Sequence, residues 1–372
     1  MELKIFDRNL NFIKIIDNAI SLTWTRRLYD VGECSLKVPF NFENVSILKK
    51  DNIICKGDDF CYIESVEIIV DDSGEYINIA GKTLNNYLER RVIYGSVQLE
   101  GNAVDNIYKL VNTQCIQTEP DRVIPLLTLS EEKPEVSNIN NIVVTYENLL
   151  DEVKKICKNA DLGFKIVPDL KTKRLVFSVY KGMDRSINQN VLPHVIFSRN
   201  FENILSQNYL ESLNGYKNVV YVNANGDDEN TYNKVVGTAK GLDRFENVSD
   251  ITVKDTVIEK VWSEEKGEYV DCTKTIPNET VMGQLEESGK QTLKQNEQIR
   301  NFEGSIFLNN ATRYKEDFDL GDNVTVLDST WQVQFDVIIT DIIEQYTQSE
   351  VIINIEFGKD LPTFKELIKN NR

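Results

Sequence analysis

The chain has 372 residues, enough for about two or three domains with cores of their own. Asp and Glu number 59 against 42 Lys and Arg, and the formal net charge of -17 repels the phosphates of nucleic acids and acidic membranes. A protein that grips DNA is therefore disfavoured, whereas one past which DNA slides is not excluded. The chain lacks an apolar run of the roughly twenty residues that a membrane helix needs and a signal-peptide core, so we expect a soluble protein made in a cytoplasm.

The N-terminal third alternates apolar and polar residues in the manner of β-strands. Segments 3–7 and 12–17 flank a turn at 8–11, segment 21–40 bends at Asp30–Glu33, and segments 61–70 and 76–81 meet across 71–75. This pattern predicts an antiparallel barrel or sandwich. Residues 83–95 then predict a short helix that continues into an extended segment.

The period changes from about residue 102. Segments 102–115 and 145–164 place apolar residues at helical spacing, with Gly163 beyond the second helix, and a polar loop separates the two helices. Segments 164–169 and 175–182 follow as a hairpin. Residues of about 100–190 thus predict an α+β unit.

Strand patterns return after residue 218, with segments 218–226, 232–241 and 249–272. Residues 278–302 predict a polar helix with few apolar anchors, interrupted by Gly283 and Gly289, which favours a bridging helix over a core element. Segments 302–308, 322–328, 335–346 and 351–358 form a second antiparallel cluster, and 364–370 is a short amphipathic tail. The fold class is therefore a β-rich α+β fold, with two β clusters around a mixed middle.

The acidic stretch Asp317–Asp328, "DFDLGDNVTVLD", raises the question of a calcium site. An EF-hand loop needs a central glycine at its sixth position and a closing Glu at its twelfth, and here the glycine comes one place early and the last residue is Asp. A turn fits better: Gly321 can take a positive φ, Asp322 caps it, and Val324 and Val326 begin a half-buried strand.

Residues for catalysis or metal binding form no recognisable site. Any Ser/His/Asp or Cys/His mechanism must use the single histidine, His194, which lies in "VLPHVIFS" without a nucleophile motif, so we interpret it as a packing residue at the start of a strand. The cysteines lack a CxxC pair and are expected to be reduced and mostly buried: Cys34, Cys55, Cys61, Cys115, Cys157 and Cys272. We expect no catalytic, cofactor-binding or metal-binding residues.

Two further functions leave weak traces. A glycosidase needs only two carboxylates, which this acidic chain could supply, but Trp24, Trp262 and Trp331 lie in separate strand-like segments rather than beside one acidic cluster. Arginines occur in the short motifs "TRRLY", "ERRVIYG" and "SRNF", each beside an aromatic, which predicts solvated or salt-bridged strand faces and not a nucleic-acid stripe.

The ordered combination of motifs resembles the siphophage-type tail and baseplate hub family. That family is related in fold to the baseplate hubs of contractile phages and to the hub portion of tail-associated lysins. The segments that carry the resemblance are "FDRNLNFIKIID", "LTWTRRLYDVGECSLKVPF", "LERRVIYG", "FSRNFENILSQNYLESLNGYKNVVYV" and "DFDLGDNVTVLD". Their marks are Trp24, Arg26, Tyr29, Gly32-Glu33, Val38-Pro39, Phe197-Ser198, Tyr216-Lys217-Asn218 and Leu320-Gly321-Asp322.

The resemblance implies a non-enzymatic, homotrimeric ring at the tip of a phage tail or phage-like bacteriocin. Each chain would carry two antiparallel β-barrel-like tube domains enclosing a mixed α+β middle region, so that three chains offer six similar units to a hexameric tube. The implied segments are 1–98 (first barrel), 99–195 (α+β insert), 196–298 (β-rich segment with the bridging helix) and 299–372 (strands completing the second barrel, plus the tail).

The implied partners are the tail tube or distal tail protein, the tape measure protein, and spike or receptor-binding proteins. DNA passes without specific binding, and no membrane insertion is expected. The protein would assemble in the host cytoplasm and reside at the virion tail tip or baseplate. From the net charge of -17 we expect an inner wall enriched in Asp and Glu. The alternative function is a tail-associated carbohydrate-binding or cell-wall-degrading protein.

Overall fold

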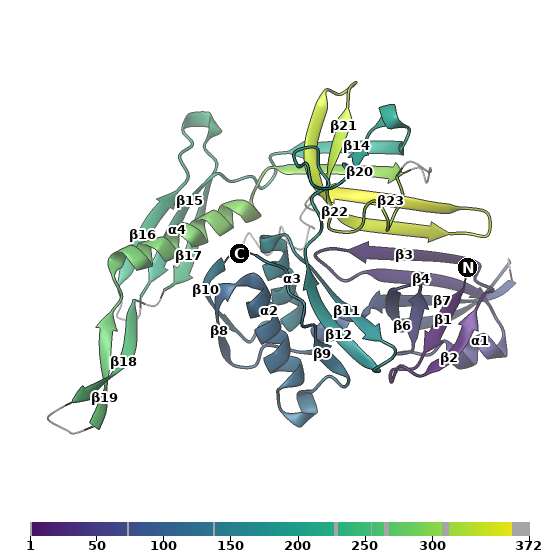
Figure 1. Cartoon of the computed structure of the whole chain (residues 1–372), viewed down its shortest axis with the longest axis horizontal. Coiled ribbons are helices and arrows are strands. Elements are labelled where there is room, and N and C mark those ends of the chain that lie inside the picture. Colours follow the sequence, from purple (N-terminus) through teal and green to yellow (C-terminus); the bar gives the residue numbers. More distant parts are fainter. Residues whose placement is uncertain are drawn as a thin grey trace.

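A computed structural model of the chain describes residues 2–72, 74–136, 138–226, 230–253, 255–263, 268–306 and 312–358 (Figure 1). Thirteen strands of this described part form one continuous sheet. Its N-terminal strands are β1 (Leu3–Phe6), β2 (Phe12–Ile16), β3 (Ser21–Arg27), β4 (Glu33–Pro39), β5 (Ile53–Lys56), β6 (Asp59–Asp71) and β7 (Gly74–Thr83). Its C-terminal strands are β13 (Ile196–Phe197), β14 (Ile204–Ser212), β20 (Ile299–Ile306), β21 (Asn323–Asp328), β22 (Val333–Tyr346) and β23 (Val351–Gly358).

The two β clusters share this one sheet because β22 pairs with β3, with Ile343 opposite Thr25. The strand order is β14-β20-β23-β22-β3-β4-β7-β6-β5-β1-β2, and β21 joins β22 to β13 at one side. Each half nevertheless has its own apolar core, one around Trp24 and the other around Phe197 and Phe357. The β-rich α+β class is confirmed, and the pairing of the two halves is an addition that the sequence pattern did not predict.

The predicted N-terminal hairpins are present. The Asp7 carboxylate fixes the β1–β2 turn, since it accepts hydrogen bonds from the backbone N–H groups of Asn9 and Asn11. Gly32 allows the β3–β4 connection, because a Cβ there would lie 2.3 Å from the carbonyl oxygen of Thr25. The short helix α1 (Phe42–Ile47) follows β4 and is capped by Asn41.

The middle region contains both predicted helices and the predicted hairpin. Its elements are η1 (Leu84–Arg90), β8 (Ser96–Asn102), α2 (Ala103–Val111), η2 (Asn112–Ile116), η3 (Pro120–Arg122), β9 (Leu127–Leu129), β10 (Asn138–Thr145), α3 (Leu149–Ala160), β11 (Gly163–Asp169) and β12 (Arg174–Tyr180). Helix α3 begins after the cap Asn148 and ends at Asp161 in the left-handed conformation. The predicted polar loop instead carries β9 and β10, which pair with β12 and β8.

The remaining elements form a unit beside the main sheet (Figure 1). They are β15 (Val219–Asn225), β16 (Thr231–Val236), η5 (Gly241–Asp243), β17 (Glu246–Thr252), β18 (Thr256–Ser263), β19 (Glu268–Thr275) and α4 (Asn278–Gln295), whereas the short η4 (Arg199–Phe201) joins β13 to β14 within the main sheet. Helix α4 ends before residue 299, where β20 begins, so the predicted helix 278–302 is too long. The predicted tail helix at 364–370 lies outside the described residues.

The expectation that α4 merely bridges other elements is wrong. Its buried residues Val281, Leu285 and Gly289, spaced by four, pack against the sheet β16-β15-β17. A Cβ on Gly289 would come within 2.5 Å of the Val236 side chain and 3.1 Å of Val222. The narrow apolar seam suffices because this glycine lets the helix backbone approach the sheet closely.

Candidate functional site: a polar sheet face with two free edges

The main sheet contains an antiparallel run of eight strands in the order β14-β20-β23-β22-β3-β4-β7-β6, beyond which β5, β1 and β2 continue from the N-terminal part of β6. Each neighbouring pair in this run is antiparallel. Because the number of strands is even, the first strand, β14, and the last, β6, run in opposite directions. The N-terminal and C-terminal halves of the chain supply four strands each.

Both ends of the run have a free edge. Strand β6 pairs with β5 only over residues 59–62, and among the described residues 64–71 have no strand on that side. Strand β14 pairs only with β20 in the described part of the chain. Near the β6 edge, Ile68 and Val70 are 50% and 71% exposed. Unpaired strand edges with exposed apolar side chains are ready to pair with another strand.

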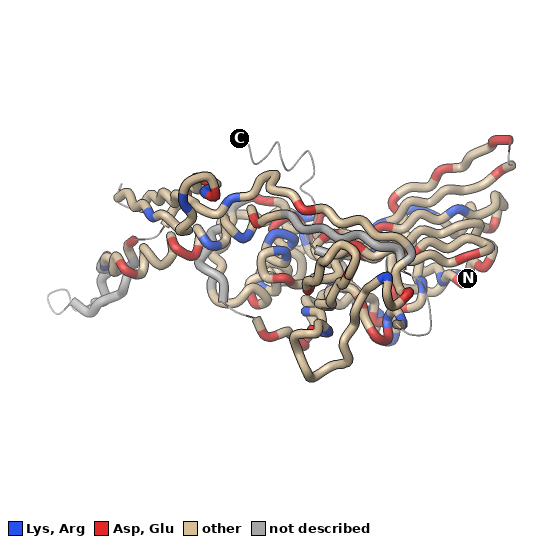
Figure 2. Tube along the Cα trace, turned by 90° about the horizontal axis from the view of Figure 1, so that it is seen from above, with Lys and Arg blue, Asp and Glu red and all other residues tan. Residues whose placement is uncertain are grey.

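The sheet face opposite the two cores is mostly polar, as the strand register shows. We call it the polar face. Its described side chains include Ser65, Glu67, Ile69, Tyr76, Asn78, Ala80, Lys82, Glu33, Ser35, Lys37, Thr23, Thr25, Arg27, Asp341, Ile343, Gln345, Ile352, Asn354, Glu356, Ser206, Asn208 and Leu210. Figure 2 shows the strands of this sheet from above, with Lys and Arg beside Asp and Glu.

The cations of the polar face are held by neighbours. Arg27 lies 3.2 Å from the carboxylates of both Glu33 and Asp341. Lys82 lies 3.2 Å from Glu64, and the Lys37 ammonium lies over the Tyr76 ring, 3.4 Å from its centroid. Each positive charge is therefore compensated, by a carboxylate or by the negative face of an aromatic ring. Such a surface offers little attraction for phosphate.

On the core side, a cluster of buried charges joins the two halves of the sheet, and we call it the charged seam. The Glu344 side chain in β22 is only 2% exposed; its carboxylate lies 2.5 Å from the Lys56 ammonium of β5 and accepts a hydrogen bond from Tyr346. Arg26 of β3 lies 3.3 Å from Asp59. Since these side chains come from both halves, the seam fixes how β22 sits on β3.

The charged seam also holds the 312–320 loop. The Tyr314 hydroxyl donates to Glu344 at 3.0 Å and accepts from Arg26 at 2.9 Å, while Lys315 lies 2.7 Å from Asp59. Burial favours a raised pKa for Asp59, but the charges of Arg26 and Lys315 outweigh it and lower the pKa of that carboxyl. Asp59 thus stays ionised between the three cations Arg26, Lys56 and Lys315.

The Asp317–Asp328 stretch forms the predicted turn. Gly321 has φ of 93°, and strand β21 begins at Asn323. The Asp322 carboxylate accepts from the backbone N–H groups of Met183 at 2.7 Å and Asp319 at 3.0 Å. Among the described residues, no group of three or more His, Cys, Asp or Glu is placed to hold a metal ion. The carboxylate joins distant segments, a role that the sequence signal for a turn did not reveal.

His194 lies elsewhere than expected. The prediction of a packing residue is wrong, because its ring is exposed and its Nε2 is 2.8 Å from the carbonyl oxygen of Gln189 in the same loop. Five of the cysteines are described and are buried and free, whereas the side chain of Cys272 lies outside the described residues. Burial raises the pKa of Cys55 to about 11 and that of Cys115 to about 12, so these thiols are poor nucleophiles.

Four arginines of the short arginine motifs are salt-bridged, whereas Arg91 donates hydrogen bonds to the backbone carbonyl oxygens of Arg122 and Val123. Besides Arg26 and Arg27, Arg90 lies 3.0 Å from Asp51, and Arg199 lies 2.6 Å from Asp328. Trp24 is fully buried, and Trp331 lies in the turn before β22, with the Arg199 guanidinium 5.2 Å from the centre of its ring. The side chain of Trp262 lies outside the described residues.

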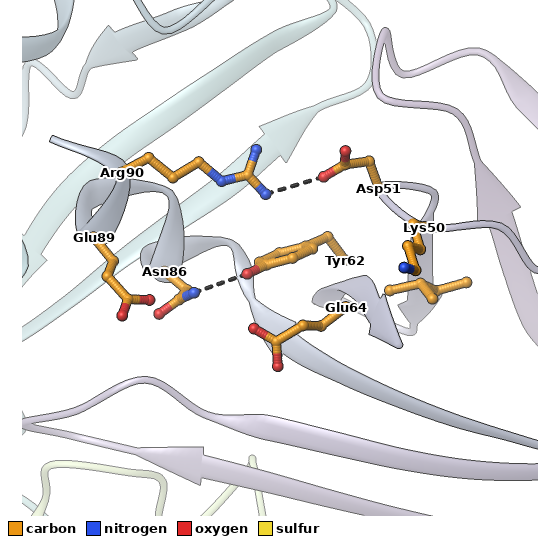
Figure 3. A pocket seen from close by; sticks show the side chains of 8 residues that line it. Lys50, Asp51, Tyr62, Glu64, Asn86, Glu89 and Arg90 are labelled. Atoms are coloured by element: carbon orange, nitrogen blue, oxygen red, sulfur yellow. Dashed lines mark hydrogen bonds and ion pairs between the residues drawn. The ribbon is translucent and has the colours of Figure 1, made fainter. Parts of the chain in front are cut away.

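A polar pocket of about 490 Å³ opens where β6 leaves β5 (Figure 3). Its lining is Lys50, Asp51, Tyr62, Ile63, Glu64, Asn86, Glu89 and Arg90. The Arg90 guanidinium lies over the rings of Tyr62 and Tyr87, which stack 5.1 Å apart, and Asn86 donates to the Tyr62 hydroxyl at 2.8 Å. The pocket is thus built on a fixed aromatic floor beside the free edge of β6. Sequence reasoning missed it because its residues come from three separate segments.

Comparison with known proteins places the chain in a family. Residues 2–359 match the family model described as Siphovirus ReqiPepy6 Gp37-like protein, so the chain belongs to that family. This match confirms the predicted resemblance to a phage tail protein family. A comparison with curated protein sequences finds no match. Among the described residues, none of the helices has the length and apolar character needed to cross a membrane.

Solved structures share the fold over nearly the whole chain. The prophage tail protein gp18 from Listeria monocytogenes EGD-e is 10% identical, with a TM-score of 0.58 over 100% of this chain and 98% of that one. The tail protein from Neisseria meningitidis MC58 is 12% identical, with a TM-score of 0.60 over 96% of each chain. The 43 kDa tail protein of prophage MuSo2 from Shewanella oneidensis is 11% identical, with a TM-score of 0.56 over 96% and 98%.

Proposed function

We propose that this member of the Siphovirus ReqiPepy6 Gp37-like family is the structural hub of a tail tip or baseplate, in a phage or a phage-like bacteriocin. Three copies form a closed ring that joins the tail tube or distal tail protein to the spike or receptor-binding proteins. The tape measure protein and then the DNA pass through it. The protein resides at the virion tail tip after assembly in the host cytoplasm, and the proposal assigns it no catalysis.

The observation that carries this proposal is the even antiparallel run with a free edge at each end. When the 64–71 edge of β6 meets β14 of the next copy, the two strands are antiparallel, so the alternation continues around the ring. A head-to-tail contact of this kind closes if its rotation closes. The contact also covers Ile68 and Val70, which a single copy leaves in water.

The four-plus-four composition of the run supports the match to a hexameric tube. Strands β6, β7, β4 and β3 come from the N-terminal half, and β22, β23, β20 and β14 from the C-terminal half. Strands β5, β1 and β2 fold back over the first core, and β13 and β21 over the second, which supports two barrel-like tube domains. The proposed segments remain 1–98, 99–195, 196–298 and 299–372.

In this ring the polar face lines the channel, because the cores occupy the other side of the sheet. The polar face carries four described carboxylates and three cations. The cations already interact with neighbouring side chains of the same copy. The carboxylates are Glu33, Glu67, Asp341 and Glu356, and the cations are Arg27, Lys37 and Lys82. We therefore expect a weakly acidic wall along which DNA moves without being held. Tight, salt-sensitive binding of duplex DNA by the assembled ring would contradict this arrangement.

A charged edge tests the proposed ring. The double variant Ile68→Lys with Val70→Lys places two cations where the next copy should dock, and both positions are exposed enough in one copy to leave its fold intact. The matched control is Val248→Lys in β17, a strand position 59% exposed and distant from both edges. Light scattering and negative-stain microscopy of assembled tails should show loss of the hub ring in the edge variant only. Normal rings in the edge variant would refute the proposal.

A further inference from the structure

We infer that the polar pocket beside β6 is a socket for the turn 213–217 of the neighbouring copy, so that each socket is completed by another chain. The inference rests on the proposed ring and adds an occupant that the strand edges alone do not specify. The directions of the two strands place the turn: β14 of the next copy runs antiparallel to β6, so the C-terminal end of that β14, Ser212, lies toward Glu64. The turn that follows β14 then lies over the pocket.

Face continuity restricts the register between the copies. The polar face must continue across the junction, so residues such as Glu67 of β6 oppose residues such as Asn208 of β14. The free edge 64–71 is eight residues long and β14 is nine, which allows pairing over almost the whole of both. Any register near full overlap brings the 213–217 turn to the pocket end of β6.

The turn has a fixed shape before docking. The N–H of Tyr216 donates to the Leu213 carbonyl oxygen at 3.0 Å, and the N–H of Asn214 donates to the Ser212 hydroxyl at 3.1 Å. Gly215 takes the positive φ of 75° that the turn requires. Leu213 is 51% exposed at the end of β14. A preorganised turn with an exposed apolar tip loses little conformational entropy on binding.

The charges that line the pocket indicate which side chain of the 213–217 turn enters it. The pocket holds the carboxylates of Asp51, Glu64 and Glu89 against the cations Lys50 and Arg90, and Arg90 is already paired with Asp51. Within the described part of the chain, neither the Glu89 carboxylate nor the Lys217 ammonium lies within hydrogen-bond or ion-pair distance of a partner, and the Lys82 ammonium interacts with the Glu89 charge only at longer range. The Lys217 backbone is held by a hydrogen bond from its N–H to the Asn296 carbonyl oxygen at 2.8 Å. We therefore assign Glu89 of one copy and Lys217 of the next as partners.

Cross-linking separates this inference from the ring itself. One variant carries Glu89→Cys with Lys217→Cys, and a second carries Glu67→Cys with Asn208→Cys across the strand edges. Both also carry Cys272→Ser, and the five described native cysteines are buried, so the engineered thiols are the reactive ones. The full chain and assembled tails are treated with a flexible bismaleimide. Covalent trimers from both variants support the socket. Trimers from the edge pair without trimers from the Glu89–Lys217 pair overturn the socket and leave the ring standing, whereas trimers from neither pair overturn both.

A charge exchange measures the contact. Glu89→Lys and Lys217→Glu should each weaken ring association about fivefold, and the double variant should restore it, as expected for one surface ion pair. Lys171→Glu, in the exposed β11–β12 turn, is the matched control and should have no effect. Failure of the double variant to recover association would overturn the assignment of these two partners, because each single loss would then come from something else.

Discussion

The charged seam gives the sharpest stability test, through the Lys56→Met variant. Lys56 is the cation nearest the Glu344 carboxylate, 2.5 Å away, and the Glu344 side chain is only 2% exposed. Removing one partner of a buried ion pair costs about 3–5 kcal/mol, because the remaining charge is left without compensation. Here the hydroxyls of Tyr314 and Tyr346 still donate to that carboxylate, so we expect the lower end, about 3 kcal/mol.

A second substitution separates lost packing from the uncompensated charge. In Lys56→Met with Glu344→Gln the buried charge is gone, the amide oxygen accepts from one tyrosine hydroxyl and the amide NH2 donates to the other, so stability should return to within about 1 kcal/mol of the original. The matched control is Lys133→Met, which breaks an ion pair of 2.6 Å to Asp105 that is half exposed and should cost less than about 1 kcal/mol.

The fluorescence of Trp24 reports the outcome locally. This fully buried ring lies 5.4 Å from the Lys56 ammonium, and replacing Trp262 and Trp331 by Phe leaves it as the single indole. Urea unfolding at neutral pH then gives the free energy of the N-terminal half. A loss of unfolding free energy below about 1 kcal/mol for Lys56→Met would refute the proposed role of the charged seam. So would a double variant whose loss equals the sum of the losses caused by Lys56→Met and Glu344→Gln alone.

Five further substitutions test other features. Gly289→Ala should destabilise the packing of α4 on its sheet by about 1–3 kcal/mol, because the added methyl group overpacks the contact. Gly283→Ala, which lies in open space on the same helix, should stabilise the protein by up to about 1 kcal/mol. Thermal melts that rank the two variants in the opposite order would contradict the close packing of α4 at Gly289. Gly321→Val should cost about 1–2 kcal/mol or more at its positive φ, checked by urea unfolding. Burial would raise the pKa of Asp328, but its hydrogen bonds lower that pKa to about 2. The ionised carboxylate therefore stabilises the fold above pH 4, and this stabilisation is lost as the pH falls toward 2. Asp328→Asn should remove this pH dependence from the acid unfolding curve. His194→Ala should alter stability by no more than about 1 kcal/mol and leave infectivity unchanged, and loss of infectivity by correctly assembled particles would assign this exposed ring a function.

Local features were predictable because their causes are local. The turn at Gly321, the helix α3 and the hairpin β11–β12 follow from backbone freedom, capping and alternation over a few residues. The pairing of β3 with β22 was not predictable, since many apolar alternations in this chain fit one another equally well. Long-range register depends on contacts that no single segment contains.

Strand β22 shows why the candidate site was missed. Hydropathy favours Ile343 inside and Glu344 outside, whereas the structure buries Glu344 and places Ile343 on the polar face. The reversal is stable because Lys56 and two tyrosine hydroxyls, far away in the sequence, satisfy the carboxylate. The same limit applies to the pocket, whose residues meet only after β5, β6 and η1 have folded.

The β3–β22 pairing has a mechanical consequence for the proposed ring. Six junctions join its four-stranded units, and they alternate in kind: three lie within a chain and carry the charged seam, while three lie between chains and depend on strand edges and sockets. A radial load from a passing polymer would be shared by all six, but rupture would begin at the junctions between chains. Such a ring would widen with threefold symmetry although it presents six units to the tube, because every second junction is a weaker contact between chains.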